Sequence, residues 1–438
     1  MLESTKIIDF AIDFLKNKGI NAYLYLISNN TEKYNCKTYK INFYDYYNSN
    51  ILIVTLVENN KYHSFKLYKL NTENELKDEL NKCITMFKLI NKKPDKLPLP
   101  PMETKIYNYD IYDSSIENTD KTPILKALTN LYKAYEKDIK AVLFNEGINI
   151  VCTIENHFFA NKDKVLSYDI TNFTLEIPYK LKDKKNTKQY YFKEKYHKLN
   201  DFYNIDLTKK IFAQIVNCSH DTQQIFNKNI NLILTNMALV KFLNFLAKKT
   251  ILPNSMFANK QNKFFDINFN LNDDGMYSTG YNTRPFDATG WTVTSKQLFK
   301  NGFLNEPIIP NYYNNQPPTG NAFFDNSFNI IYQPTNLIME KGKFKKNEYI
   351  FFLDPGVILH DINSILLDDK NNIIINGNGE YFNKQKKAFN VKQLYIKTNF
   401  YSFLKKIKYI GEEQIKLQNI VGYPILMENI NASTIEDI

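Results

Sequence analysis

The sequence of 438 residues is poor in arginine, tryptophan and glycine. Arg284 is the only arginine among 56 basic residues, and Trp291 is the only tryptophan. Eleven of the 13 glycines lie at or after Gly275. Because glycine permits tight turns, we expect longer regular elements in the first half and many turns in the second. Lysine, asparagine, isoleucine, tyrosine and phenylalanine are abundant, as in genomes with AT-rich codons.

The formal net charge of +10 and the isoelectric point near 9.0 raise the question of nucleic-acid binding. Arginine is the better phosphate clamp and base reader, and it is almost absent here. We therefore expect the lysines to form a solvated surface, and nucleic acid is not the expected partner.

Membrane spans and cysteine frameworks are also missing. No apolar run approaches the roughly 18 residues that a membrane helix needs, and the acidic N-terminal residues do not resemble a signal peptide. These features predict a cytoplasmic protein with no membrane contact. The four cysteines, at positions 36, 83, 152 and 218, are widely spaced without a C-x-x-C pair, which argues against a disulfide scaffold or a zinc knuckle.

The common catalytic motifs are absent as well. No histidine has another within five positions, so the chain lacks the paired histidines of a zinc-peptidase helix. It also lacks a G-x-S-x-G nucleophile elbow and a phosphate-binding loop. The histidines are His63, His157, His197, His220 and His360.

The pattern of apolar residues predicts an α+β protein. We expect an N-terminal α/β lobe of two subdomains and a C-terminal β-rich, largely antiparallel domain. Residues 1–95 would form an N-terminal α+β subdomain, 102–222 a central α+β subdomain and 229–438 the C-terminal domain. A proline-rich linker, Lys92–Pro101, would separate the first two.

The spacing of apolar residues, and the residues that typically begin or end helices and strands, predict the individual elements. A phase slip at Asn172 suggests a bulge, and Lys180–Lys198 is interpreted as a solvated loop or an exposed hairpin. Strands are predicted at Ala22–Ile27, Lys37–Phe43, Ile51–Glu58, His63–Leu70, Val142–Glu155, Val165–Pro178 and Leu232–Leu234, and helices near Ile7–Leu15, Thr72–Ile90, Leu207–Asn217, Met237–Ala247 and Asn399–Ile410.

The segment from Asn282 to Gly302 contains both rare residues. In its Phe-Asp-x-x-Gly turn, Phe286 would be a buried anchor, Asp287 would accept backbone hydrogen bonds and Gly290 would take a positive φ. Arg284 and Trp291 would then flank one rigid corner. Two interpretations stay open: a buried pair that fixes the turn, or a contact surface, since arginine and aromatic residues are enriched at interface hot spots.

Four motifs in order along the second half carry a resemblance. They are Phe-Asp-x-x-Gly at Phe286–Gly290, Gly-x-Leu at Gly302–Leu304, Thr-Gly-Asn-Ala at Thr319–Ala322, and Pro-Thr-Asn-Leu at Pro334–Leu337 before Gly342. With these motifs the chain resembles the TldD/PmbA family, whose older name is modulator of DNA gyrase. The segments Ile375–Ile407 and Val421–Leu426 resemble the family's last strands and helix.

The resemblance implies a choice between two kinds of subunit. In this family a TldD-like subunit holds zinc with a His-Glu-x-x-x-His helix and a late cysteine, whereas a TldE-like (PmbA) subunit lacks both. Here the corresponding helix, Met237–Ala247, has no histidine or glutamate, and the last cysteine is Cys218. The resemblance therefore implies a non-catalytic TldE/PmbA-like subunit with no catalytic residue and no metal of its own.

Such a subunit would pair with a TldD-like metallopeptidase subunit that holds the zinc. The heterodimer would act on unfolded or precursor peptides, and this chain would form part of the peptide chamber. The residues expected at the substrate or subunit contact are Arg284, Phe286, Asp287, Gly290, Trp291, Thr319, Gly320 and Asn321.

Two other functions remain open at this point. One is a nucleic-acid or topoisomerase-associated regulatory factor, which would bind through Lys180–Lys198 and Lys341–Lys346. The other is a self-sufficient divergent peptidase with a reorganised site. The sequence leaves open the peptide substrate, the identity of the partner and self-association.

Overall fold

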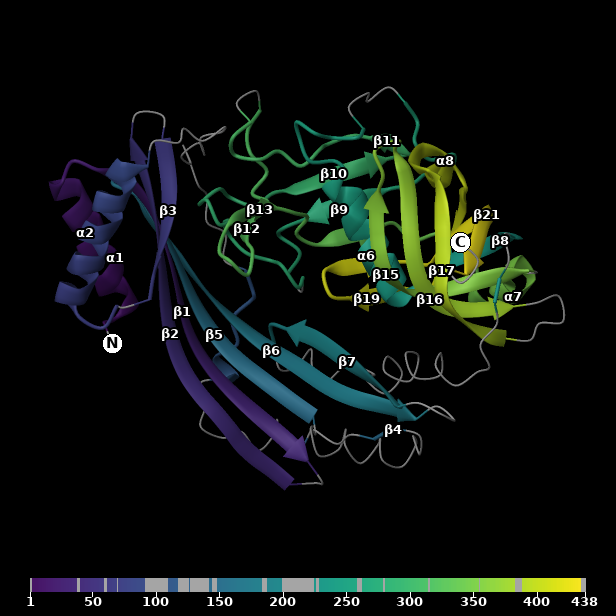
Figure 1. Ribbon diagram of the computed structural model, residues 1–438, viewed down its shortest axis with the longest axis horizontal. Helices are drawn as coiled ribbons and strands as arrows, with labels where there is room; N and C mark the ends of the chain where they lie inside the picture. The colour runs from purple at the N-terminus through teal and green to yellow at the C-terminus, as the bar shows by residue number, and fades with distance from the viewer. Residues whose placement is uncertain are drawn as a thin grey trace.

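Most of the chain folds into one elongated molecule, seen in a computed structural model (Figure 1). The predicted linker Lys92–Pro101 and the predicted helix Leu207–Asn217 lie outside the described residues. In the described part of the chain, no helix is both long and apolar enough to cross a membrane. The structure describes residues 2–37, 40–58, 61–68, 70–90, 109–116, 126, 142–143, 148–182, 187–198, 224–225, 228–257, 262–278, 280–313, 316–353, 355–382 and 388–434.

The N-terminal lobe is organised around one antiparallel sheet in the order β3-β2-β1-β5-β6-β4, with β7 paired to β6. Strands from both predicted N-terminal subdomains therefore share a sheet, and the limits of those subdomains stay a prediction. The strands are β1 (Asn21–Lys37), β2 (Lys40–Glu58), β3 (Lys61–Leu67), β4 (Val142–Leu143), β5 (Ile148–Ala160), β6 (Val165–Lys182) and β7 (Thr187–Tyr196).

Two helices cover one face of this sheet at the end farther from the C-terminal domain (Figure 1). They are α1 (Ser4–Asn17) and α2 (Glu73–Leu89). α1 ends before Gly19, whose φ is +68°, as expected of a glycine that closes a helix. α2 begins after Thr72, whose side chain accepts a hydrogen bond from the Glu75 N–H at 3.2 Å, so the predicted helix cap is confirmed.

Two predictions for the lobe were wrong in detail. β2 is a single strand where two were predicted, because its pairing with β1 continues through the segment between them. β6 keeps its register with β5 through Asn172, so the predicted bulge is absent. The phase slip arises because Ile170, Thr171, Asn172 and Phe173 are all buried. Successive side chains of a strand point to opposite faces, so both faces of β6 are covered here. Lys180–Lys198 includes the β6–β7 hairpin, which pairs Lys182 with Thr187.

In its described residues, the C-terminal domain has two six-stranded sheets and a small hairpin. One sheet has the order β17-β16-β15-β8-β21-β18, and a further β17–β21 pairing closes it on itself. Most pairs are antiparallel, as predicted. The strands of this sheet are β8 (Lys228–Leu234), β15 (Gly356–Leu367), β16 (Asn372–Phe382), β17 (Ala388–Asn399), β18 (Ile407–Ile410) and β21 (Ile425–Thr434).

The second sheet has the order β11-β10-β9-β14-β20-β19. The predicted helix Asn399–Ile410 was too long: α8 covers Phe400–Lys405, and β18 follows it to pair with β21. A short helix, α7 (Tyr349–Phe352), precedes β15. The strands are β9 (Leu271–Asp274), β10 (Ser295–Lys300), β11 (Phe303–Leu304), β14 (Leu337–Met339), β19 (Ile415–Leu417) and β20 (Ile420–Gly422), and the hairpin is β12 (Ala322–Phe324) with β13 (Ile330–Tyr332).

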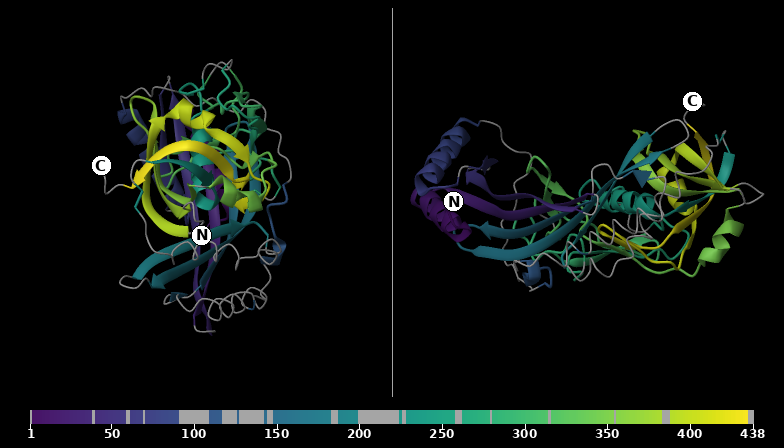
Figure 2. Two further views of the ribbon diagram at one scale, coloured as in Figure 1. Left: turned by 90° about the vertical axis from the view of Figure 1, so that its right-hand side faces the viewer. Right: turned by 90° about the horizontal axis from the view of Figure 1, so that it is seen from below.

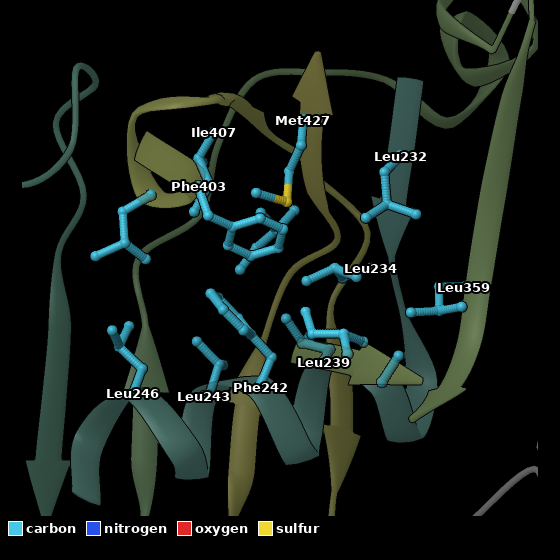
Figure 3. Close-up of a cluster of buried hydrophobic side chains, with 14 of the residues drawn as sticks. Leu232, Leu234, Leu239, Phe242, Leu243, Leu246, Leu359, Phe403, Ile407 and Met427 are labelled. Carbon is cyan, nitrogen blue, oxygen red and sulfur yellow. The ribbon is translucent and has the colours of Figure 1, made fainter. Parts of the chain in front are cut away.

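Helix α6 (Asn236–Lys248) lies in the core between the two sheets, in contact with β15 of one and with β19 and β20 of the other. Figure 3 shows its side chains pointing into a cluster with those of the surrounding strands and α8. A helix that is apolar on most of its surface is a buried helix. Its buried residues are Ala238, Leu239, Val240, Phe242, Leu243, Leu246 and Ala247.

The second face of the N-terminal sheet lies against the C-terminal domain (Figures 1 and 2). There an aromatic and aliphatic cluster joins Tyr25, Ile53, Phe159 and Leu166 of the sheet to Phe286 of the C-terminal domain. We call the region where β1, β5, β6 and β7 face residues 280–293 and β12–β13 the junction. In the junction, charged, polar and aromatic side chains from the two halves of the chain lie close together.

Candidate functional site

The Phe-Asp-x-x-Gly turn is held by the buried carboxylate of Asp287. Its Oδ1 accepts hydrogen bonds from the Thr289 N–H (2.8 Å), the Thr289 hydroxyl (2.7 Å) and the Trp291 N–H (3.1 Å). Its Oδ2 accepts from the Ala322 N–H at 3.0 Å. Burial raises the pKa of Asp287, while Arg284 and these hydrogen bonds act in the opposite direction. The predicted role of Asp287 as the acceptor that fixes the turn is confirmed.

The turn packs directly on the N-terminal sheet. Phe286 is fully buried, and its ring meets those of Tyr168 and Tyr25 edge-on, with centroids 4.9 and 6.3 Å apart. Gly290 has φ +81°, as predicted, and a Cβ at this position would overlap the ring of Phe159. The glycine therefore serves two needs, a left-handed backbone and a close approach to the sheet.

The two rare residues lie on either side of this turn, and both are half-buried. The Arg284 guanidinium stacks on the Phe323 ring, 3.5 Å from its centroid, and Nη2 donates to the Ala322 carbonyl at 2.9 Å. Its Nε is buried without a hydrogen-bond partner. A substrate or subunit contact for Arg284 and Trp291 remains a prediction.

The Thr-Gly-Asn-Ala motif lies beside the turn and is structurally linked to it. The Thr319 hydroxyl donates to Asn321 Oδ1 at 2.7 Å, and the buried Asn321 side chain donates to Asp273 Oδ2 at 2.8 Å. Gly320 has φ +69°, and a Cβ there would lie 2.5 Å from the Val293 Cα. The structure thus brings all eight predicted residues into one region, with these three directed into the interior of the domain.

Sequence reasoning missed the buried ion pair to which this motif connects. Asp273 is completely buried, and Lys296 Nζ lies 3.1 Å from its Oδ2. Oδ1 accepts from the N–H and the hydroxyl of Thr335, at 2.7 and 2.5 Å. One signal in the sequence could have indicated this pair. Asp273 lies on the same buried face of β9 as Leu271, and a carboxylate on a buried face needs a partner.

A second polar group lies on the sheet side of the junction. His157 Nε2 is 2.9 Å from Glu155 Oε2, and its Nδ1 is 3.1 Å from the Tyr25 hydroxyl. The imidazole stacks on Tyr168 with centroids 4.7 Å apart. In a neutral imidazole whose Nε2–H donates to the carboxylate, Nδ1 is the acceptor for the Tyr25 hydroxyl.

Burial and hydrogen bonding shift the pKa of Glu155 in opposite directions. Burial raises the pKa of Glu155, but the hydrogen bond from His157, the His157 and Lys195 charges and the hydrogen bond from Asn172 lower it overall. Burial raises the pKa of Tyr168 to about 12. A carboxylate–imidazole–phenol chain can hold or pass a proton, and no motif in the sequence pointed to it, since the three residues come from two strands.

Strand β7 adds one basic residue, Lys195, to the junction. Lys195 is half-buried, with Nζ 4.4 Å from the centre of the Tyr281 ring. Burial lowers its pKa to about 8; Glu155 opposes this shift, and Arg284 and Lys193 add to it. The chain thereby places a second cation close enough to Arg284 for their charges to interact.

His197, also on the sheet side, connects the two halves of the chain. Its Nδ1 lies 2.9 Å from the Thr171 carbonyl oxygen and its Nε2 lies 2.9 Å from the Gly280 carbonyl oxygen. Burial lowers the pKa of His197 to about 4, with the Lys195 charge adding to the effect and the two carbonyls opposing it. The neutral ring has one N–H, so it donates to one of the two carbonyls at a time.

Zinc in a peptidase needs three histidine, cysteine or carboxylate side chains around one point. Among the residues that the structure describes, no three such side chains gather in this way. Helix α6 has no histidine, cysteine or carboxylate side chain, and its Lys241 and Asn244 pair with Asp361 at 2.8 Å and with Asn419 at 3.0 Å. The residues of α6 therefore do not fit a zinc ion.

Comparisons with known proteins give a consistent result. Residues 225–434 match the model of the PmbA/TldA metallopeptidase C-terminal domain. No curated protein matches the chain in sequence. Two similar solved structures are described as candidate modulators of DNA gyrase. The one from Bacteroides thetaiotaomicron has a TM-score of 0.83 and 14% identity over 99% of this chain and 100% of that one. The one from Thermotoga maritima has a TM-score of 0.76 and 14% identity over 98% and 100%.

A third similar structure is TldE from Thermococcus kodakarensis, with a TM-score of 0.77 and 15% identity over 98% of this chain and 99% of that one. At such low identity these likenesses show a shared fold. The family model adds the relationship in sequence that the fold alone does not give. Residues 225–434 therefore belong to the TldD/PmbA family, and the chain shares the fold of these solved structures along almost its whole length.

Proposed function

We propose that this chain is the non-catalytic, TldE-like subunit of a heterodimeric TldD/TldE-type zinc metallopeptidase that acts on unfolded or precursor peptides. The observation that carries the proposal is the chemistry of α6. In TldD-like subunits, the resemblance places the zinc-binding residues on this helix. Here its inward positions are apolar and packed in the core, and its polar side chains Lys241 and Asn244 are paired elsewhere.

The zinc and the general base would then come from the TldD-like partner. This chain would supply part of the wall of the peptide chamber, and extended peptide would be held there mainly through main-chain hydrogen bonds. The junction supports that role, because it combines a half-buried arginine, tryptophan and lysine with hydrogen-bonding groups from two halves of the chain.

Pairing can be tested by co-expressing the tagged chain with the TldD-like subunit of the same genome. We expect the two to co-purify at equal stoichiometry. Trp291→Ala should weaken pairing or peptide cleavage while leaving the isolated chain folded, as judged by urea unfolding. Phe351→Ala is the matched control, because this aromatic side chain is 72% exposed in α7, and we expect it to change neither property.

Two outcomes would count against the proposal. If the chain never associates with a TldD-like subunit but cleaves peptides alone, it is a self-sufficient peptidase. If Trp291→Ala unfolds the chain and leaves association intact in whatever folds, the Phe-Asp-x-x-Gly corner has a structural role only.

A further inference from the structure

The junction holds two cationic side chains that lack a carboxylate partner. Arg284 projects from the C-terminal side and Lys195 from β7 on the sheet side. Arg284 stacks on Phe323 and bonds a carbonyl, whereas Lys195 lies over the ring of Tyr281. Among the ion pairs of the described residues, neither cation has a carboxylate within 4.0 Å.

The nearest carboxylates are already committed to other donors. Asp287 accepts four hydrogen bonds within its own turn and from Ala322. Glu155 is bonded through Oε2 to His157 and through Oε1 to Asn172. Half-buried cations that lack a counter-ion carry a desolvation cost, which a bound anion would offset. The pKa of Lys195 reflects this cost, because burial and the Arg284 charge both lower it.

Hydrogen-bond acceptors without partners lie on the same face of the sheet. Asn172 is 5% exposed, and its side-chain Nδ2 bonds Glu155 while its Oδ1 is buried without a partner. Asn29 on β1 also has a buried Oδ1 without a partner, and it is directly opposite Glu155 in the β1–β5 register. The junction therefore offers unused N–H donors and cations together with unused amide acceptors.

We propose that the junction binds the C-terminal carboxylate of a peptide, with Arg284 and Lys195 as its cationic partners. A guanidinium suits a carboxylate because its fork of N–H groups matches the two oxygens. The amide oxygens of Asn172 and Asn29 would accept the main-chain N–H groups that precede the carboxylate. A simple inorganic anion has no such N–H groups, so the combination favours a peptide end. This inference rests on the proposed function, since it names the part of the peptide that this subunit takes.

The test uses the full-length chain and three fluorescent peptides that share one sequence up to the last residue. The first has a free C-terminal carboxylate, the second a C-terminal amide, and the third a C-terminal amide on a final glutamate. By fluorescence anisotropy we expect the free acid to bind about tenfold more tightly than the plain amide, as for a charge-assisted hydrogen bond. Lys195→Gln should remove most of this preference, and Arg284→Lys, which keeps the charge but loses the fork, should reduce it in part.

Lys249→Gln is the matched control, because Lys249 lies 5.0 Å over the Phe245 ring, outside the junction, and we expect it to keep the full preference. Equal binding of acid and amide, or a preference that persists in Lys195→Gln, would overturn the inference while peptide binding itself stands. If the glutamate amide binds as tightly as the free acid, the assignment to a chain terminus is wrong. If no peptide binds, the proposed function fails and the inference fails with it.

Discussion

Replacing Gly290 by alanine should destabilise the chain far more than the same change at Gly19. Both glycines have a left-handed backbone, with φ +81° and +68°, so both variants carry a conformational strain of about 1–2 kcal/mol. At Gly19 nothing lies within 4 Å of an added Cβ. At Gly290 the Cβ would lie 2.5 Å from Cδ1 and 2.7 Å from Cζ of Phe159. Overpacking of this kind costs about 1–3 kcal/mol more.

Urea unfolding of the two variants gives the comparison, and the difference between them isolates the contact with the sheet from the backbone strain. A second variant then tests the cause directly. In a Phe159→Ala background the ring is gone, so the cost of Gly290→Ala should fall to about that of Gly19→Ala. If Gly290→Ala costs no more than Gly19→Ala in the wild-type background, the turn does not pack on Phe159 as described.

Three further predictions follow from other parts of the structure. Lys296→Met should cost about 3–5 kcal/mol of unfolding free energy because it leaves Asp273 buried without its cation, whereas Lys346→Met, in an exposed pair, should cost under about 1 kcal/mol; similar costs would refute the argument. His197 has a folded-state pKa of about 4 against 6.5 in the unfolded chain, so its stabilisation is present above pH 6.5 and is lost as the pH falls through 4. Between about pH 7 and 4.5 the wild type should lose about 2 kcal/mol more than His197→Gln, and equal losses would contradict this. Metal analysis of the purified chain should find no stoichiometric zinc, and one tightly bound zinc per chain would show that the proposed division of roles is wrong.

Local patterns predicted the Phe-Asp-x-x-Gly turn well, because its requirements lie within five residues. The buried Phe286, the accepting Asp287 and the positive φ of Gly290 all follow from turn chemistry. The α+β class and the apolar helix α6 follow from periodicity in the same way.

Long-range partners could not be predicted in this manner. Asp273 meets Lys296 across β9 and β10, and Glu155, His157 and Tyr25 come together only once β1 pairs with β5. The bulge at Asn172 was predicted wrongly because the apolar residues of β6 switch from one face of the strand to the other there. That switch looks like a bulge in the sequence, but it arises because both faces of β6 are covered. The helix Asn399–Ile410 was overextended because an apolar run fits a helix and a buried strand equally well.

The most direct test of the central claim is peptide cleavage measured for this chain, for its TldD-like partner and for their mixture, each with and without a chelator. We expect cleavage by the mixture alone, abolished by the chelator, with zinc recovered on the partner. Chelator-sensitive cleavage by the isolated chain would contradict the account, because it would require a catalytic metal site in a chain to which we assign none.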